Sequence, residues 1–409
     1  MPRPGQVTSS SRERLPDRIA IGVLTRAFPP ELVDEVLAAT GRVEQRKRLL
    51  PARVVVYFVL AMCLFRQEGY EEVTRLLTNG LAWTRHWQAQ WQAPTTAALS
   101  RARARLGAEP VAALFERVAT PVATAATAGA WYRGHRLVAV DGTTFDLADT
   151  PANGDYFGRP GSSRGDGVSA YPQARVVALA ECGTHAIFTA TSAPLTTTES
   201  KLVPKLWPAL APDMLLLADR ALLSFDAWRA TTATGADLLW RARSSAVLPV
   251  TRQFDDGSYL SEIVAARDKN RRADPATVRV VEFTLGEAAT VYRLVTSLLD
   301  PEQAPAAELA ALYAQRWEIE TALDELKTHQ GGPNLILRSQ HPDGVEQELY
   351  GFLLTHHALR GLMHDTAASA ETDPDRISFL RTLRVVRRQV TDQAAFSPEP
   401  PDASTTVHP

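Results

Sequence analysis

The chain has 409 residues, a formal net charge of −2 at pH 7 and 45% hydrophobic residues. This is enough apolar material for a large core in two or three domains. The composition excludes a wholly disordered chain and a chain that is basic throughout, although one domain could still carry a basic surface. Two cysteines, Cys63 and Cys182, cannot build a disulfide framework or a cysteine-based zinc site, which fits a reducing cytoplasm.

The N-terminus is polar and shows no secretory signal. The longest apolar run, residues 54–65, lies between Arg53 and Arg66. It is too short to span a bilayer, so it predicts a buried helix. We therefore expect a cytoplasmic protein with no membrane partner.

The first part of the chain is predicted to be helical. Residues 1–15 are rich in Ser, Pro and Arg and predict a disordered tail, whereas residues 16–110 predict a small all-α domain. Near its end, Thr95 or Thr96 can cap a helix that Gly107 stops. Arg101 and Arg105 on this helix are candidates for contact with a DNA groove or backbone, and a solvated face is the alternative.

The pattern changes after residues 111–135, whose alanine-rich sequence predicts a linking helix. Residues 136–140 form a short apolar run that predicts a buried strand ending at Asp141. A second such run, residues 214–218, ends at Asp219. Either acid alone is explained well by a turn at the end of a strand.

The stretch from Tyr313 to Lys327 predicts a helix with one polar row. Tyr313, Arg316, Glu320 and Lys327 are spaced i, i+3, i+7 and i+14, which places them within an arc of about 60° on one face of an α-helix. An ordinary amphipathic helix explains this row when it is taken alone.

The order of the predicted elements is that of an α/β, ribonuclease H-like fold, a three-strand meander followed by strands that add in parallel. In such a sheet Asp141 and Asp219 share one edge, where Glu320 on a packed helix can meet them. Three carboxylates suit Mg²⁺ or Mn²⁺, and two such ions would support displacement at phosphorus. The predicted division is a catalytic domain (136–242 and 300–365), a β-rich insertion (243–299), a basic C-terminal helix (366–391) and a disordered tail (392–409).

The spacing Tyr313-x2-Arg316-x3-Glu320-x6-Lys327 resembles the Y-R-E-K signature of bacterial DDE transposases of the insertion-sequence-four type. The segments VAVDGTTFDLADT and LLLADRALLS, which hold Asp141 and Asp219, are similar to the family's surroundings of its first two acids.

The resemblance implies a DNA transposase that binds double-stranded DNA, both the terminal inverted repeats of an insertion element and a target. It implies metal-dependent strand cleavage and transfer with Asp141, Asp219 and Glu320 as catalytic metal ligands, at least a transient homodimer, and association with the nucleoid. Arg316 and Lys327 would contact phosphates. Tyr313 would hydrogen-bond a phosphate or be a half-buried core residue, and Arg220 would contact DNA or neutralise the acids.

Some points stay open at this stage. Trp240 and Trp317 are both available to stabilise a flipped base in a hairpin intermediate. His356 and His357 lie in an apolar segment with no third ligand at a recognisable spacing, so they predict a packed helix. A catalytically silent, transposase-derived DNA-binding regulator is one alternative function. A two-carboxylate glycosidase is another, but it gives no reason for Arg316 and Lys327.

Overall fold

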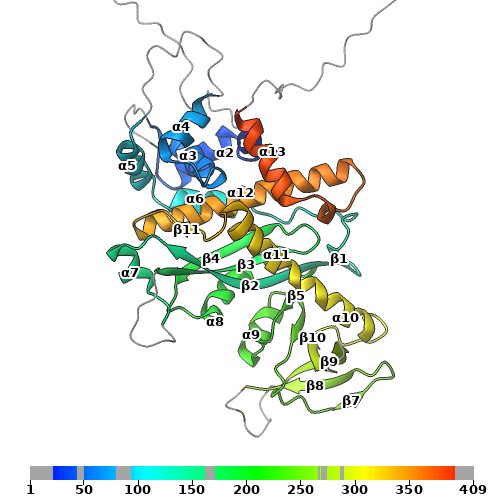
Figure 1. Cartoon of the computed structure of the whole chain (residues 1–409). Coiled ribbons are helices and arrows are strands. Elements are labelled where there is room, and N and C mark those ends of the chain that lie inside the picture. Colours follow the sequence, from blue (N-terminus) through cyan, green and yellow to red (C-terminus); the bar gives the residue numbers. More distant parts are fainter. Residues whose placement is uncertain are drawn as a thin grey trace, which may run out of the picture.

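The computed structural model describes residues 22–43, 50–79, 94–161, 171–265, 268, 274–285 and 290–391. The predicted tails, 1–15 and 392–409, lie outside these ranges. Helices dominate the N-terminal part (Figure 1), namely α1 (Gly22–Ala27), α2 (Pro30–Ala39), α3 (Ala52–Leu64), α4 (Tyr70–Asn79), α5 (Thr96–Leu106) and α6 (Glu109–Val118). No helix in the described ranges is both long enough and apolar enough to cross a membrane.

Helix α3 is the centre of this helical part. It is the predicted apolar helix, and nearly all of its side chains are buried against α2, α4, α5 and the long helix α12 (Pro342–Ser369). Of the two predicted caps of α5, Thr95 is the one observed, because its side chain accepts a hydrogen bond from the Ala98 N–H. Gly107 ends α5 with a positive φ of 75°.

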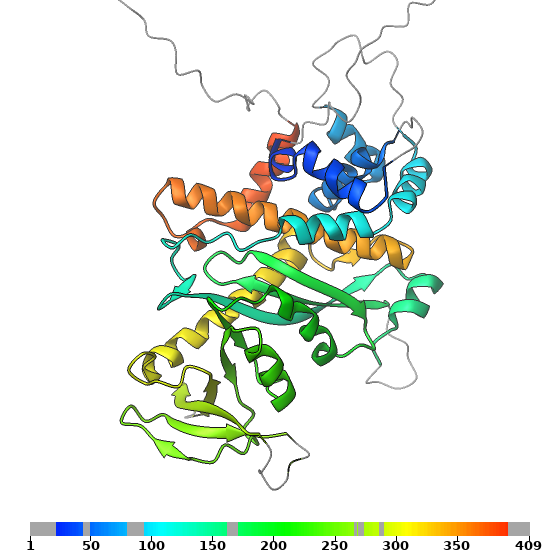
Figure 2. The ribbon, with the colours of Figure 1, turned by 180° about the vertical axis from the view of Figure 1, so that it is seen from behind.

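A single mixed sheet runs through the rest of the molecule (Figure 2). Its strands along one path are ordered β4-β3-β2-β5-β6-β10-β9-β8-β7, with β1 and β11 also paired to β2. Their bounds are β1 (Trp131–Tyr132), β2 (His135–Leu147), β3 (Gln173–Glu181), β4 (Ile187–Pro194), β5 (Met214–Ala218), β6 (Asp237–Arg241), β7 (Arg252–Gln253), β8 (Tyr259–Ile263), β9 (Ala276–Leu285), β10 (Thr290–Thr296) and β11 (Ile336–Leu337).

The predicted fold class is confirmed by this topology. Strands β2, β3 and β4 form an antiparallel meander, and β5 and then β6 add in parallel beside β2. The β-rich insertion continues the same sheet, because β10 pairs antiparallel with β6. Within the predicted β-rich insertion, the apolar run 247–252 suggests a strand from the sequence, but only Arg252 of this run belongs to one.

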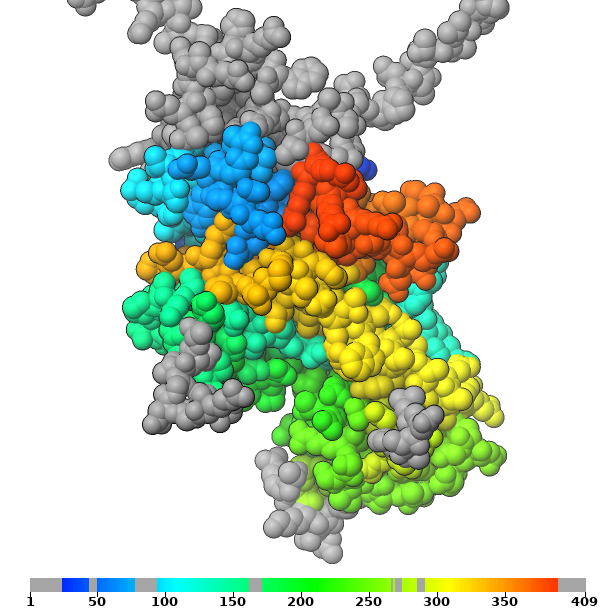
Figure 3. Space-filling model, viewed as in Figure 1, coloured from blue at the N-terminus to red at the C-terminus, as the bar shows by residue number. Residues whose placement is uncertain are grey.

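Two hydrophobic layers enclose the sheet. One face packs on α12, on the helical part and on a segment built from α10 (Ala306–Leu312), the 3₁₀ turn η3 (Tyr313–Arg316), α11 (Trp317–Asp324) and the π-helical η4 (Glu325–Gln330). The opposite face packs on α8 (Glu199–Leu202), η2 (Val203–Ala209) and α9 (Phe225–Thr232). Figure 3 shows the helical part and the strand-built insertion at opposite ends of the molecule.

Two helix predictions need correction. The linking helix expected over 111–135 ends at Val118 in α6. Pro121 follows soon after, and the next two N–H groups, of Val122 and Ala123, bond the carboxylate of Glu181 instead of continuing a helix. At the C-terminus, the basic helix is α13 (Phe379–Thr391), while residues 366–369 still belong to α12. The short helices α7 (Pro151–Phe157) and η5 (Pro374–Arg376) complete the described elements.

Candidate active site

Asp141 lies in the middle of strand β2, which corrects the expectation that the strand ends at this residue. The strand continues to Leu147, and Asp141 is paired with Ala178 on β3. Thr143, Thr144 and Phe145 are residue types that favour an extended backbone, and they carry the strand past the acid. Asp141 is therefore held by a continuous ladder on one side.

The other side of β2 has a gap beside Asp141. There β2 pairs with β5 through residues 136–139 and with β11 through residues 146–147. In the part of the chain that the structure describes, no ladder partner lies between these two stretches. Because Ala139 is paired with Leu217, Asp141 and Asp219 each lie two residues beyond this last pair. Both acids consequently face the same side of the sheet at the edge of the gap.

The segment carrying Glu320 is not the regular α-helix that the spacing predicts. It is 3₁₀-helical over Tyr313–Arg316, α-helical over Trp317–Asp324 and π-helical over Glu325–Gln330. Two contacts with other parts of the sheet and of α12 explain why the segment departs from regular α-helical geometry. Tyr313 Oη donates a hydrogen bond of 3.2 Å to the Ala218 carbonyl, and buried Glu325 is drawn towards Arg360 and His356 on α12.

Arg316 bonds Glu320, lies near Asp141 and feels the charge of Asp219. Its Nη2 is 2.8 Å from Glu320 Oε1, and its Nη1 is 4.0 Å from Asp141 Oδ2. Burial alone would lower the pKa of Arg316, but the hydrogen bond to Glu320 and the nearby charges, Asp219 included, raise it. The guanidinium therefore lies where the fields of all three carboxylates meet.

Asp141 and Asp219 have oxygens that lack full compensation. Burial raises the pKa of Asp141, the Gly142 N–H and Arg316 only partly oppose this effect, and Glu320 adds to it. Asp219 Oδ1 is buried without a hydrogen bond from any described residue, and the Arg241 guanidinium is 3.9 Å away. Hard carboxylate oxygens that need a positive partner fit Mg²⁺ or Mn²⁺, and Asp141, Asp219 and Glu320 are the residues that could hold such an ion at the gap.

Lys327 borders the same gap from the π-helical segment. Its Nζ is 3.2 Å from Thr143 Oγ1 and 5.7 Å from the Phe145 ring centroid. Thr143 lies two residues from Asp141 on the same face of β2. The structure thus brings Lys327 and Arg316 to the side of the sheet that carries the acids.

Tyr313 differs from the expected phosphate contact. Its side chain is buried, its hydroxyl hydrogen is used by the Ala218 carbonyl, and burial raises its pKa. This is the core tyrosine that the sequence left open as the alternative. By holding the last residue of β5, Tyr313 supports the backbone just before Asp219.

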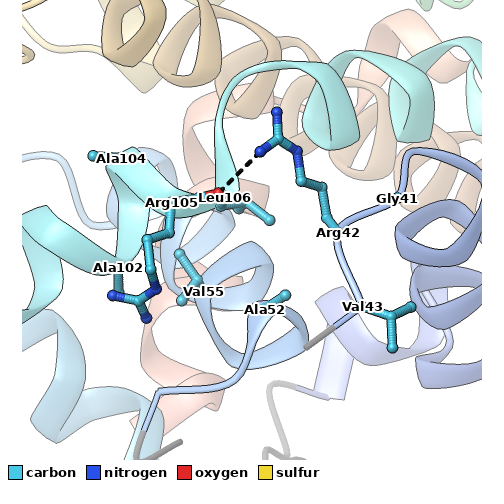
Figure 4. Close-up of a pocket in the computed structure, with 9 residues that line it drawn as sticks. All are labelled: Gly41, Arg42, Val43, Ala52, Val55, Ala102, Ala104, Arg105 and Leu106. Carbon is cyan, nitrogen blue, oxygen red and sulfur yellow. Dashed lines mark hydrogen bonds between the residues drawn. The ribbon is translucent and has the colours of Figure 1, made fainter. Parts of the chain in front are cut away.

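The other predicted DNA contacts are exposed, and of these Arg220 is next to one of the acids. Arg220 is exposed beside Asp219, and Arg101 is exposed on α5. Arg105 donates to the Leu50 carbonyl at 3.4 Å and lines a cavity of about 430 Å³ together with Arg42 (Figure 4). These α5 arginines belong to the helical N-terminal part and do not approach the three carboxylates.

The sequence analysis did not select Glu199, which acts on Asp141 through its charge, or Arg175, which bonds Glu199. Glu199 begins α8, and its carboxylate is 2.8 Å from Arg175 Nη1 on β3. Its charge is one of those that raise the pKa of Asp141. In the sequence, Glu199 has only the ordinary signature of an acid in the first turn of a helix, so the pattern gave no reason to select it.

A second group of possible metal ligands, His185, Glu318 and Asp375, lies behind the catalytic segment. Arg360 donates a hydrogen bond to His185 Nδ1, so the neutral ring carries its proton on Nε2. That nitrogen faces Asp375 at 3.4 Å and Glu318 at 3.7 Å. With the proton on Nε2, this nitrogen faces the two carboxylates as a hydrogen-bond donor, so in this state the group joins α11 to its neighbours.

The remaining aromatic and histidine candidates are also placed. Trp240 is fully buried in the sheet and packs edge-on against Trp228, whereas Trp317 is 61% exposed with the Arg316 guanidinium 5.1 Å from its ring. His356 and His357 are buried in α12, as the packed-helix prediction states.

Known protein families match both parts of this architecture. The model described as "Insertion element 4 transposase N-terminal" matches residues 18–116. The model described as "Transposase DDE domain" matches residues 132–356, more than half of the chain. The chain belongs to the DDE transposases of the insertion-sequence-four type.

Two relatives from Escherichia coli (strain K12) resemble the transposase. "Transposase InsG for insertion sequence element IS4" is 29% identical over 376 residues, which are 90% of this chain and 83% of the relative. "Putative transposase InsZ" is 26% identical over 216 residues, 52% of this chain and 68% of the relative. A piggyBac transposase synaptic complex with hairpin DNA aligns with 92% of this chain and 81% of its own, at 12% identity and a TM-score of 0.46.

Proposed function

We propose that the transposase binds the terminal inverted repeats of an insertion element and catalyses metal-dependent cleavage and strand transfer with Asp141, Asp219 and Glu320. One observation carries this proposal: Asp141 and Asp219 face one gap in the sheet, and Arg316 joins Asp141 to Glu320 across it. The membership of the DDE transposase family supports it.

The three carboxylates would hold two Mg²⁺ or Mn²⁺ ions, which supply Lewis-acid activation of a water or 3′-hydroxyl and of the leaving oxygen. The chain's own residues orient the reactants. Arg316, fixed by Glu320, balances the acids and offers its remaining N–H groups to a phosphate. Lys327 supplies a point charge at the other end of the gap.

The substrate would be double-stranded DNA, with element ends and target held in turn at this gap. Arg101 and Arg105 on α5, together with Arg220 near Asp219, are exposed cations suited to the phosphate backbone. Strand transfer joins two element ends to one target, so we propose a homodimer in the DNA complex. Trp317, exposed beside Arg316, is the better placed of the two tryptophans to stack on an unpaired base.

A cleavage and joining assay on labelled inverted-repeat ends tests the proposal. With Mg²⁺ or Mn²⁺ we expect the wild-type chain to nick the ends and join them to target DNA. Asp141→Ala, Asp219→Ala and Glu320→Gln should bind the ends but neither cut nor join them. The proposal is wrong if these variants react as fast as wild type, or if wild type binds the ends but never cuts them with either metal.

A further inference from the structure

Strand β2 and Glu199 approach each other so closely at Gly142 that any other residue at this position would displace the Glu199 side chain. A Cβ placed on Gly142 would lie 2.9 Å from both Cδ and Oε1 of Glu199. Gly142 is in extended strand conformation with no positive φ, so a substitution here would meet the Glu199 side chain and would not strain the backbone. The carboxylate of Glu199 therefore rests directly on the backbone next to Asp141.

Arg175 holds Glu199 in this position. The Arg175 side chain comes from β3, where it is paired with Thr144, and its Nη1 bonds Glu199 Oε1 at 2.8 Å. Residues 138 and 140 of β2 and residues 177 and 179 of β3 belong to the layer with α8. By strand alternation, Gly142 and Arg175 face that layer too, whereas Asp141 faces the other. Glu199 is consequently a support beneath the strand and does not point into the gap.

The supported peptide unit orients one oxygen of Asp141. The Gly142 N–H donates a hydrogen bond of 2.7 Å to Asp141 Oδ1. The other oxygen, Oδ2, is the one that faces Arg316 at 4.0 Å. Any tilt of the Gly142 peptide would rotate the carboxylate and move Oδ2 relative to the gap.

We propose that Glu199 and Arg175 are a positioning pair, which fixes the Gly142 peptide and thereby the orientation in which the Asp141 carboxylate would meet the metal. This inference rests on the proposed function, in which Asp141 is a metal ligand. Glu199 acts through the strand and is not itself a ligand. Groups that orient metal ligands typically change metal affinity by about 10- to 100-fold when they are removed.

Direct Mn²⁺ binding to the full chain, followed by electron paramagnetic resonance of the free ion, tests the pair without relying on activity. Glu199→Ala should weaken binding by about 10-fold, and Gly142→Ala should do the same because its new methyl group displaces Glu199. The double variant should bind no more weakly than Glu199→Ala alone, since the methyl group then has nothing to displace. Additive losses, or unchanged affinity in Glu199→Ala, would overturn the proposal.

The variant Glu199→Gln tests whether Glu199 acts by resting on the Gly142 backbone or by its negative charge. The amide oxygen can still accept from Arg175 and rest on Gly142, so we expect affinity near that of wild type. A loss as large as that of Glu199→Ala would mean that Glu199 acts as a charge or a ligand, and the positioning role would be rejected. Thermal unfolding temperatures are measured for each variant, and Glu199→Ala carries the test if Gly142→Ala does not fold.

Asp141→Asn tells the two proposals apart. If this variant keeps the Mn²⁺ affinity of wild type, Asp141 is no ligand and both the metal site of the proposed function and the positioning pair fail. If Asp141→Asn loses Mn²⁺ while Glu199→Ala keeps it, only the positioning pair fails.

Discussion

The two halves of the proposed active site are held in place by different kinds of contact. Asp141 and Asp219 are placed by the register of two parallel strands, in which Ala139 lies opposite Leu217. Glu320 and Lys327 belong to a segment that is successively 3₁₀-, α- and π-helical. That segment is held from behind by side chains of α12, with Arg360 bonded to Glu325 through two nitrogens.

The difference teaches which changes should affect chemistry and which should affect folding. Backbone ladders tolerate the loss of a carboxylate, because the strand does not depend on it. A buried ion pair does not tolerate the loss of one partner, since the other charge is left in an apolar interior. Changes on the strand half should remove activity with little effect on stability, and changes behind the helical half should do the reverse.

The largest expected effect on activity comes from the strand half. Asp141→Asn and Asp219→Asn should each reduce strand cleavage by about 10⁴-fold or more, because a metal ligand is lost. Stability should be unchanged or slightly increased, since each change removes a poorly compensated carboxylate. Cleavage rates measure the loss of activity, and chemical denaturation of the same samples measures stability. A fall in stability that matches the fall in activity would contradict the prediction.

The largest expected effect on stability comes from behind the helical half. Arg360→Met should cost about 3 to 5 kcal/mol of unfolding free energy, because Glu325 is left buried without its cation. Urea denaturation measures this loss. The matched control is Arg133→Met, which removes an exposed ion pair with Glu308 and should change stability little. Equal losses in the two variants would show that burial does not decide the effect.

A pH-dependent effect of intermediate size is expected at Glu318. Burial raises the pKa of this residue to about 7, and the Gly183 N–H and His185 oppose the rise only in part. Because the folded pKa is raised, the stability that protonated Glu318 contributes is present below its unfolded value of about 4.5 and is lost as pH rises through 7. Glu318→Gln should therefore unfold at a higher temperature than wild type at pH 8 and at nearly the same temperature at pH 5. A difference of the same size at both pH values would rule out the titration.

The smallest expected effect is that of Tyr313→Phe. Losing the hydrogen bond to the Ala218 carbonyl should cost about 1 kcal/mol. Cleavage should slow modestly through a lower kcat, with the KM for element ends unchanged, because the hydroxyl supports β5 and does not contact DNA. A raised KM with an unchanged kcat would instead support the hypothesis that Tyr313 contacts a DNA phosphate.

The sequence predicted the sheet half well because strand patterns and ladder register are local and repetitive. Residues 214–218 form β5 as expected, and Asp219 follows directly. The position of Asp141 in the middle of its strand was harder to predict, because an Asp-Gly pair is typical of a turn. Here Gly142 instead leaves room for the side chain of Glu199, which lies 57 positions farther along the chain. The π-helical turn at Glu325 and the support by Arg175 likewise depend on contacts between distant segments, which no spacing rule contains.

Anomalous diffraction from crystals of the transposase with cut inverted-repeat DNA and Mn²⁺ would test the central claim most directly. We predict Mn²⁺ peaks next to the carboxylates of Asp141, Asp219 and Glu320. We also expect the side chains of Arg316 and Lys327 to contact phosphate oxygens of the DNA. A complex that holds DNA at the gap, but whose Mn²⁺ lies at His185, Glu318 and Asp375 and not at Asp141, would contradict it.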